Sequence, residues 1–139
     1  MLRQATDKDI AAMHRIRLAV KENRLTSSAI TEADYLPQIA QSGRGWVVEE
    51  NGQIQAFAIA NREEASVWAL FVAPHAEGCG YGRSLLRTMM DYFREHHLCE
   101  VKLTTEPGTR AEAFYIKAGW QPDELLENGD RLLWWRCDK

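Results

Sequence analysis

The stretch Leu70–Leu86, "LFVAPHAEGCGYGRSLL", places Gly78, Gly80 and Gly82 between an apolar run and a helical pattern. Apolar residues recur at helical spacing from there to His97, so the glycines stand at the start of a predicted helix. A glycine loses more backbone freedom on folding than any other residue, so three together need a reason. The unpaired N–H groups of a first helical turn attract anions, and an absent Cβ lets a phosphate approach the backbone. A phosphate-binding turn is therefore one interpretation, and a tight turn without a ligand is the other.

Two other kinds of phosphate loop do not fit these residues. A P-loop has lysine and then serine or threonine after its last glycine, whereas Arg83 follows Gly82. The dinucleotide-binding pattern G-x-G-x-x-G matches at Gly78 and Gly80 but has Arg83 at its third glycine position. Arg83 and Arg87 would instead add charge-assisted hydrogen bonds to an anion at the start of the helix.

The rest of the chain alternates between strand-like and helix-like patterns. Apolar spacing predicts a helix that begins at Thr6 or Asp7, and further helices over 31–39, 80–97 and 109–118. Strand-like runs cover 2–6, 45–50, 53–60, 65–72, 99–105 and 131–137, with one more short strand near Trp120. Asn51-Gly52 predicts a hairpin, and the strands on either side of the 80–97 helix are expected to be parallel neighbours. This mixed order predicts the α/β (α+β) class.

The composition limits the partners and the location of the chain. With 139 residues, 45% hydrophobic and 27% charged, we expect a single domain over 1–139. The formal net charge of −3 provides no basic field for nucleic acid or a membrane surface, and no apolar run is long enough to span a bilayer. The N-terminus lacks the pattern of a secretory signal. Cys79, Cys99 and Cys137 have no metal-like spacing, so we expect reduced thiols in the cytoplasm and no metal.

Two stretches resemble motifs of one family. "LFVAPHAEGCGYGRSLL" is similar to the acetyl-CoA-binding signature of the GNAT superfamily of N-acetyltransferases, and "TRAEAFYIKAGW" (residues 109–120) resembles its later motif around a tyrosine. The two motifs stand in the family's order, and the resemblance extends over the whole chain. It implies a mixed, mostly antiparallel central sheet with helices on both faces.

The resemblance also implies a cosubstrate, acetyl-CoA, and the residues that hold it. The strand residues Leu70, Phe71 and Val72 would lie along the pantetheine arm. The turn would hold the pyrophosphate through Gly78, Cys79, Gly80, Tyr81, Gly82 and Arg83. Two positions depart from the family pattern: Glu77 stands where glutamine or arginine is usual, and Gly108 where asparagine is frequent.

Acetyl transfer to an amine needs a base for the amine and a proton for the departing thiolate. The resemblance places Tyr115 near the cofactor sulfur, as the proton donor; a buried aromatic residue is the alternative. Glu64, Ser66, Trp68 and Leu70 would share one face of a regular strand. Glu64, directly or through water held with Ser66, is the candidate base, with an exposed loop residue as the alternative.

The sequence says least about the pocket that binds the amine acceptor. The family builds its acceptor pocket from the first two helices and their connection, here with His14, Arg17, Glu22, Asn23 and Arg24. Arginines there would hold a carboxylate of the acceptor, or form the solvated face of a helix. We expect a small-molecule primary amine rather than a protein N-terminus or lysine, with a homodimer left open. The rival function is a non-catalytic acyl-CoA-binding or interaction module.

Overall fold

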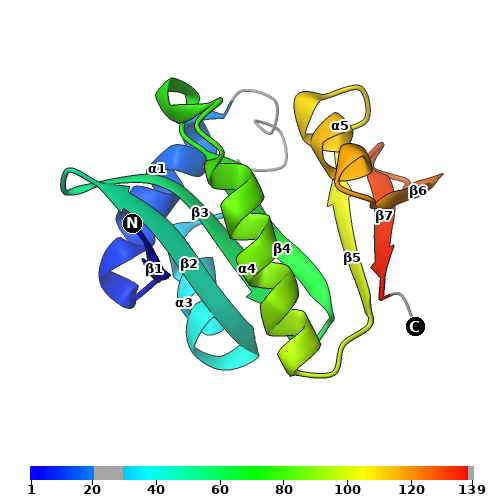
Figure 1. The fold of residues 1–139 in the computed structure, drawn as a ribbon, viewed down its shortest axis with the longest axis horizontal. Helices are drawn as coiled ribbons and strands as arrows, with labels where there is room; N and C mark the ends of the chain where they lie inside the picture. The colour runs from blue at the N-terminus through cyan, green and yellow to red at the C-terminus, as the bar shows by residue number, and fades with distance from the viewer. Residues whose placement is uncertain (21–29, 138–139) are drawn as a thin grey trace.

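The computed structural model describes residues 1–20 and 30–137 of the chain. Its centre is one seven-stranded sheet in the order β1-β2-β3-β4-β5-β7-β6, shown in Figure 1. The strands are β1 (Leu2–Gln4), β2 (Gly43–Glu50), β3 (Gln53–Asn61), β4 (Ser66–Val72), β5 (Glu100–Thr105), β6 (Gln121–Leu125) and β7 (Arg131–Arg136). Strands β4 and β5 are parallel, and all other neighbouring strands are antiparallel. The predicted fold class and the mostly antiparallel sheet are confirmed.

The helices largely follow the predicted pattern. They are α1 (Ile10–Ala19), α3 (Tyr35–Pro37), α4 (Tyr81–Glu95) and α5 (Arg110–Lys117), with short 3-10 turns before α1, α3 and α4. Thr6 begins the first helical segment, because its N–H donates to the Asp9 carboxylate at 2.8 Å. The single helix predicted over 31–39 is wrong in its form. A 3-10 turn, α3 and a π-helical turn (Gln38–Ser42) follow one another there, and Pro37 lacks the N–H that a continuous helix needs.

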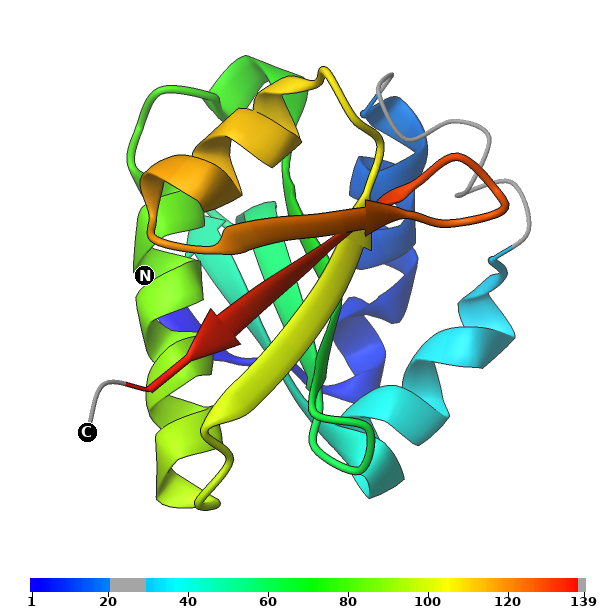
Figure 2. The ribbon, with the colours of Figure 1, turned by 90° about the vertical axis from the view of Figure 1, so that its right-hand side faces the viewer.

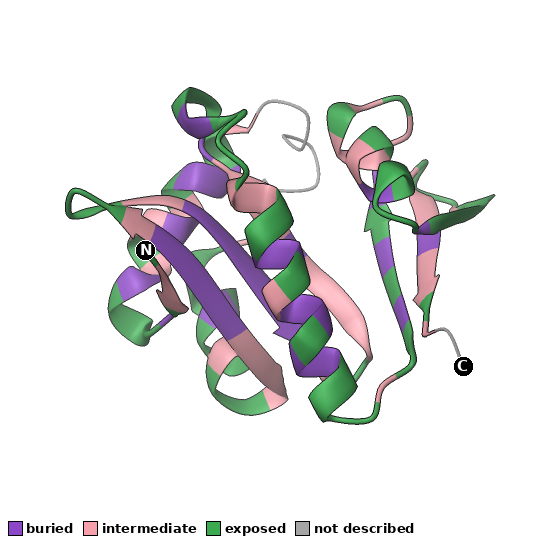
Figure 3. Cartoon of the chain, in the orientation of Figure 1, coloured by how far each residue is buried: buried purple, intermediate pink, exposed green. Residues whose placement is uncertain are grey.

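The sheet separates two apolar cores, and the helices cover both of its faces, as Figure 2 shows. The α4-side core contains the buried stripe of α4, with Tyr115 of α5 and Trp120. The α1-side core contains Met13 and Ile16 of α1 and Tyr35 of α3. Figure 3 shows the buried stripe of α4 against its exposed outer face. Each large side chain buried in these cores stabilises the fold by about 1.5–3 kcal/mol.

Strand β4 has two irregularities that affect the space beside it. It pairs in parallel with β5 at Ser66↔Lys102 and at no other pair of described residues. Its pairing with β3 shifts between Ala69 and Val67, which leaves Trp68 as an extra residue in a β-bulge. Consequently the second half of β4 has one edge without a strand partner, on the side where α5 lies.

Within the described ranges, no helix is both long and apolar enough to cross a membrane.

Candidate functional site

The predicted turn lies between β4 and α4, and its glycines adopt the backbone that only glycine takes easily. Gly78 has φ +84° and Gly80 has φ +82°, in the left-handed region that other residues rarely enter. A Cβ on either glycine would meet no atom within 4 Å, so open space borders the backbone there. Gly80 is the N-cap of α4, so the N–H groups of the first α4 turn have no carbonyl partner within the helix. This cradle fits a phosphate group.

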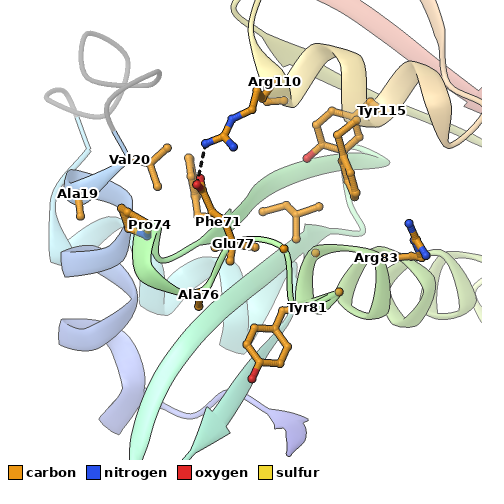
Figure 4. Close-up of a pocket in the computed structure, with 17 residues that line it drawn as sticks. Ala19, Val20, Phe71, Pro74, Ala76, Glu77, Tyr81, Arg83, Arg110 and Tyr115 are labelled. Atoms are coloured by element: carbon orange, nitrogen blue, oxygen red, sulfur yellow. Dashed lines mark hydrogen bonds and ion pairs between the residues drawn. The ribbon is translucent and has the colours of Figure 1, made fainter.

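A cavity of about 620 Å³ extends from this turn along β4 to α5, as drawn in Figure 4. The unpartnered half of β4 forms one wall, the start of α4 a second and α5 a third. The lining residues are Ala19, Val20, Leu70, Phe71, Val72, Pro74, Ala76, Glu77, Gly78, Gly80, Tyr81, Gly82, Arg83, Arg110, Ala111, Phe114 and Tyr115. The cavity therefore combines apolar walls with an anion-binding end.

Most of the predicted cofactor-binding residues lie at this cavity. Leu70, Phe71, Val72, Gly78, Gly80, Tyr81, Gly82 and Arg83 all line it. Cys79 is exposed within the turn but is not a lining residue, and neither are Arg87 and Gly108. The Gly108 N–H instead donates to the Glu112 carboxylate at 3.0 Å, which helps to begin α5.

Tyr115 lies in the wall that α5 contributes. Its ring packs edge-on against Phe114 and Trp120, with centroids 5.3 Å and 5.6 Å away. Its side chain is buried, and in Figure 4 its hydroxyl end faces the cavity. Burial raises the pKa of the Tyr115 hydroxyl well above its ordinary value. The hydroxyl is therefore protonated at neutral pH, as an ordinary tyrosine also is.

Glu64 and Ser66 do not line the cavity. Glu64 is exposed in the turn between β3 and β4, where its N–H donates to the Asn61 side chain at 2.9 Å. Ser66 is the first residue of β4, roughly 13 Å along the strand from Leu70 at 3.3 Å per residue. The expectation of a shared face is wrong for Trp68 and Leu70. The bulge turns Trp68 toward the α1-side core, whereas Leu70 packs against the α4-side core.

Arg17, a predicted acceptor residue, is buried at the end of α1 and is 4% exposed. Its guanidinium lies 4.5 Å from the Trp68 ring centroid and 5.0 Å from that of Phe71, and it donates to the Trp68 carbonyl at 3.3 Å. Burial lowers the pKa of Arg17. Arg17 thus stabilises the bulge of β4 at Trp68 and packs behind Phe71, which lines the cavity.

The other predicted acceptor residues are placed as follows. His14 Nδ1 lies 3.1 Å from the Tyr35 hydroxyl, away from the lining residues. Glu22, Asn23 and Arg24 lie outside the described residues.

One interaction at the cavity was not predicted. Arg110 Nη2 donates to Glu77 Oε1 at 2.7 Å, from the start of α5 to the turn before α4. A positive charge at a helix N-terminus opposes the helix dipole, and this mismatch is the signal that Arg110 has another use. Among the described residues, no group of three or more His, Cys, Asp or Glu side chains could hold a metal ion.

Comparisons with known proteins point to one family. Residues 10–120 match the model of the Acetyltransferase (GNAT) family. The ribosomal protein bS18-alanine N-acetyltransferase of Haemophilus influenzae is 28% identical over 81 residues, which are 57% of this chain and 56% of that protein. The match thus spans little more than half of this curated relative.

Two solved structures illustrate how closely the fold agrees. A GCN5-related N-acetyltransferase from Rhodopseudomonas palustris superposes with a TM-score of 0.82 at 15% identity, over 99% of this chain and 95% of that one. A putative acetyltransferase from Salmonella typhimurium, solved with its cofactor acetyl-CoA, gives a TM-score of 0.79 at 20% identity, over 100% and 94%.

Proposed function

The chain belongs to the GNAT family of acetyltransferases, and from this premise we propose that it transfers the acetyl group of acetyl-CoA to a primary amine, which attacks the thioester directly. The observation that carries the proposal is the single cavity that joins the glycine turn, the unpartnered edge of β4 and Tyr115. Acetyl-CoA, when bound, supplies the activated acetyl group as a thioester. Everything else in the reaction is a matter of holding the reactants and moving protons.

The proposed cosubstrate site follows the cavity walls. Backbone groups of alternate residues point to the same edge of a strand. Those of Leu70 and Val72 would therefore pair with the amide groups of the pantetheine arm at the edge of β4 that has no strand partner, whereas Phe71 lies opposite Phe57 of β3. The turn from Gly78 to Arg83 would hold the pyrophosphate through its N–H groups. Support comes from the open space beside Gly78 and Gly80 and from the N-terminus of α4, which favours negative charge.

Tyr115 is the proposed proton donor to the coenzyme A thiolate. Its hydroxyl makes no hydrogen bond to another described residue, and it belongs to the cavity lining. The hydroxyl is protonated over the whole neutral range, as any tyrosine is, so a proton is present when the thiolate departs. A thiol has a pKa of about 8.5, so its thiolate leaves tolerably well unaided, and Tyr115 accelerates this step rather than enabling it.

The amine must lose its proton before it can attack. For an amine with a pKa near 10.4, deprotonation at pH 7 costs roughly 4–5 kcal/mol. Glu64, acting through water held with Ser66, remains the proposed base. Because neither side chain lines the cavity, a chain of water molecules would have to carry the proton to Glu64.

Two acceptor classes are proposed, and one experiment separates them. The first is a small-molecule primary amine. The second is the N-terminal amine of a protein, which the similarity to a bS18-alanine N-acetyltransferase favours. We further propose a single domain over 1–139 that acts in the cytoplasm, where its three cysteines would remain the free thiols that the structure contains.

The test is a product assay with purified protein and acetyl-CoA. The acceptors are a panel of free amino acids, polyamines, a lysine-containing peptide with a blocked N-terminus and a peptide that begins with alanine. Mass spectrometry should find one class acetylated, with one CoA released for each acetyl group transferred. Binding of acetyl-CoA without acetylation of any acceptor would favour the non-catalytic acyl-CoA-binding module instead.

A further inference from the structure

The ion pair between Glu77 and Arg110 stands at the cavity that the proposed function assigns to acetyl-CoA. Its two side chains come from opposite walls, Glu77 from the turn before α4 and Arg110 from the first turn of α5. Figure 4 shows the pair meeting above the Phe71 side of the cavity. Both residues line the cavity, so any ligand that fills it comes close to both charges.

The pair is exposed enough to exchange partners. The Arg110 side chain is 73% exposed and that of Glu77 is 40% exposed. Ion pairs in such positions contribute little to stability, because water and salt screen them. A terminal phosphate, or the pyrophosphate as a whole, offers a guanidinium more acceptor oxygens and more negative charge than a carboxylate does, in a geometry that suits two parallel hydrogen bonds. A phosphate in the cavity therefore competes well with Glu77 for Arg110.

The charges of the lining support the same conclusion. Among the described lining residues, Glu77 is the one carboxylate, and Arg83 and Arg110 are the two guanidinium groups. The carboxylate reduces the positive potential at the end of the cavity where the anion-binding turn lies. It also repels a phosphate that has taken Arg110 from it. Both effects lower the affinity for a ligand that carries phosphate.

We propose that Arg110 is a phosphate-binding residue of the cosubstrate site and that Glu77 is its exchangeable counter-ion, which limits cosubstrate affinity. This inference rests on the proposed function, because it takes the phosphate groups of coenzyme A as the ligand. The carboxylate holds the Arg110 side chain over the cavity before the ligand arrives. The product, coenzyme A, keeps every phosphate, so a limit on affinity also favours its release.

Calorimetric titration of coenzyme A tests the inference with four proteins: the wild type, Glu77→Gln, Arg110→Gln and the double variant. At about 50 mM salt we expect Arg110→Gln to weaken binding by roughly 5–10-fold and Glu77→Gln to strengthen it by about threefold. The gain from Glu77→Gln should be smaller when residue 110 is glutamine. Both effects should shrink at about 500 mM salt, because the charges are screened.

The α4 ion pair Asp91–Arg94 provides the matched controls. Its atoms lie 3.0 Å apart, its side chains are 60% and 53% exposed, and neither residue lines the cavity. Asp91→Asn and Arg94→Gln change the net charge as the test variants do, and we expect each to leave the affinity within about twofold. Control effects as large as those at Glu77 and Arg110 would overturn the inference, since net charge alone would then explain them.

The remaining outcomes are also decisive. An Arg110→Gln protein with wild-type affinity, or a Glu77→Gln protein that binds no more tightly, overturns the inference and leaves the proposed function intact. A wild type that does not bind coenzyme A overturns the proposed function as well. Dephospho-coenzyme A identifies the group: the Arg110→Gln effect disappears with it if Arg110 binds the 3′-phosphate, and persists if Arg110 binds the pyrophosphate.

Discussion

Tyr115 lines the cavity and is the proposed proton donor. If its hydroxyl donates the proton to the departing thiolate, Tyr115→Phe should lower the chemical rate on the order of 10²-fold without abolishing it. The affinity for acetyl-CoA should change little, because the ring that packs against Phe114 and Trp120 remains. Single-turnover kinetics measure the rate and calorimetry measures the affinity.

A matched control for that substitution is Tyr92→Phe. Tyr92 is another buried tyrosine, but it lies on α4 outside the cavity, and its hydroxyl accepts a hydrogen bond from Arg62 at 2.8 Å. Removal of the Tyr92 hydroxyl should leave the chemical rate near that of the wild type. A Tyr115→Phe protein with an undiminished single-turnover rate would remove Tyr115 from the reaction.

Glu64 is the residue for which a pH profile is most informative. If it accepts the amine proton, Glu64→Gln should depress kcat/KM most at low pH, where little free amine exists. The deficit should narrow toward the pKa of the amine, near 10.4 for a lysine-like acceptor. Glu63→Gln is the control, since Glu63 is exposed in the same turn. An equal effect of Glu64→Gln at every pH would show that Glu64 is not the base.

At the scale of an element, the turn before α4 has to bring its backbone close to an anion. Gly80→Val should weaken acetyl-CoA binding by about 10-fold or more, because a β-branched side chain would occupy the space beside the backbone. The substitution also strains a residue at φ +82°. Calorimetry on protein shown to be folded by circular dichroism gives the affinity.

Gly129→Val is the control that separates the effect of backbone strain on stability from the effect of the Gly80 substitution on acetyl-CoA binding. Gly129 also has a left-handed backbone, with φ +93°, and a Cβ at this position would meet no atom within 4 Å. It lies between β6 and β7 and does not line the cavity. We expect it to lower the melting temperature and to leave acetyl-CoA affinity unchanged. Equal losses of affinity in the two variants would mean that the Gly80 turn contributes no special contact.

Individual elements also show what a single sequence can predict. The α4 stripe and the strand–turn–helix order depend on local spacing, so they were predictable. The bulge at Trp68 was not, because it appears only in the register of β4 against β3. The helix expected over 31–39 keeps a helical backbone through Pro37, but its hydrogen bonds change from the 3-10 to the α and then to the π pattern. Glu77 was recognised as unusual, but its pairing with Arg110, 33 residues later, requires the tertiary fold.

For the molecule as a whole, buried tyrosines link stability to alkaline pH. Burial raises the pKa of Tyr35 to about 12 and also raises that of Tyr115, whereas an unfolded tyrosine titrates near 10. Above pH 10 the unfolded chain therefore binds fewer protons than the folded protein, and the free energy of unfolding falls as pH rises. This contribution is complete below pH 10 and is lost as the pH passes through about 12.

Urea titrations at pH 8, 10 and 11 measure this decline, and Tyr35→Phe identifies one of its sources. The variant lacks the Tyr35 hydroxyl that lies 3.1 Å from His14 Nδ1. We expect it to be less stable than the wild type at pH 8 but to lose less stability between pH 8 and 11. The same loss in both proteins would show that Tyr35 does not contribute to the pH dependence.

The central claim is that one cavity holds acetyl-CoA with its thioester beside Tyr115. A crystal structure of the protein with acetyl-CoA, or with coenzyme A and an acceptor, tests it most directly. We predict the pyrophosphate on the backbone N–H groups between Gly78 and Arg83, and the sulfur within about 3.5 Å of the Tyr115 hydroxyl. A cosubstrate bound outside this cavity, or a sulfur beyond the reach of Tyr115, would contradict the claim.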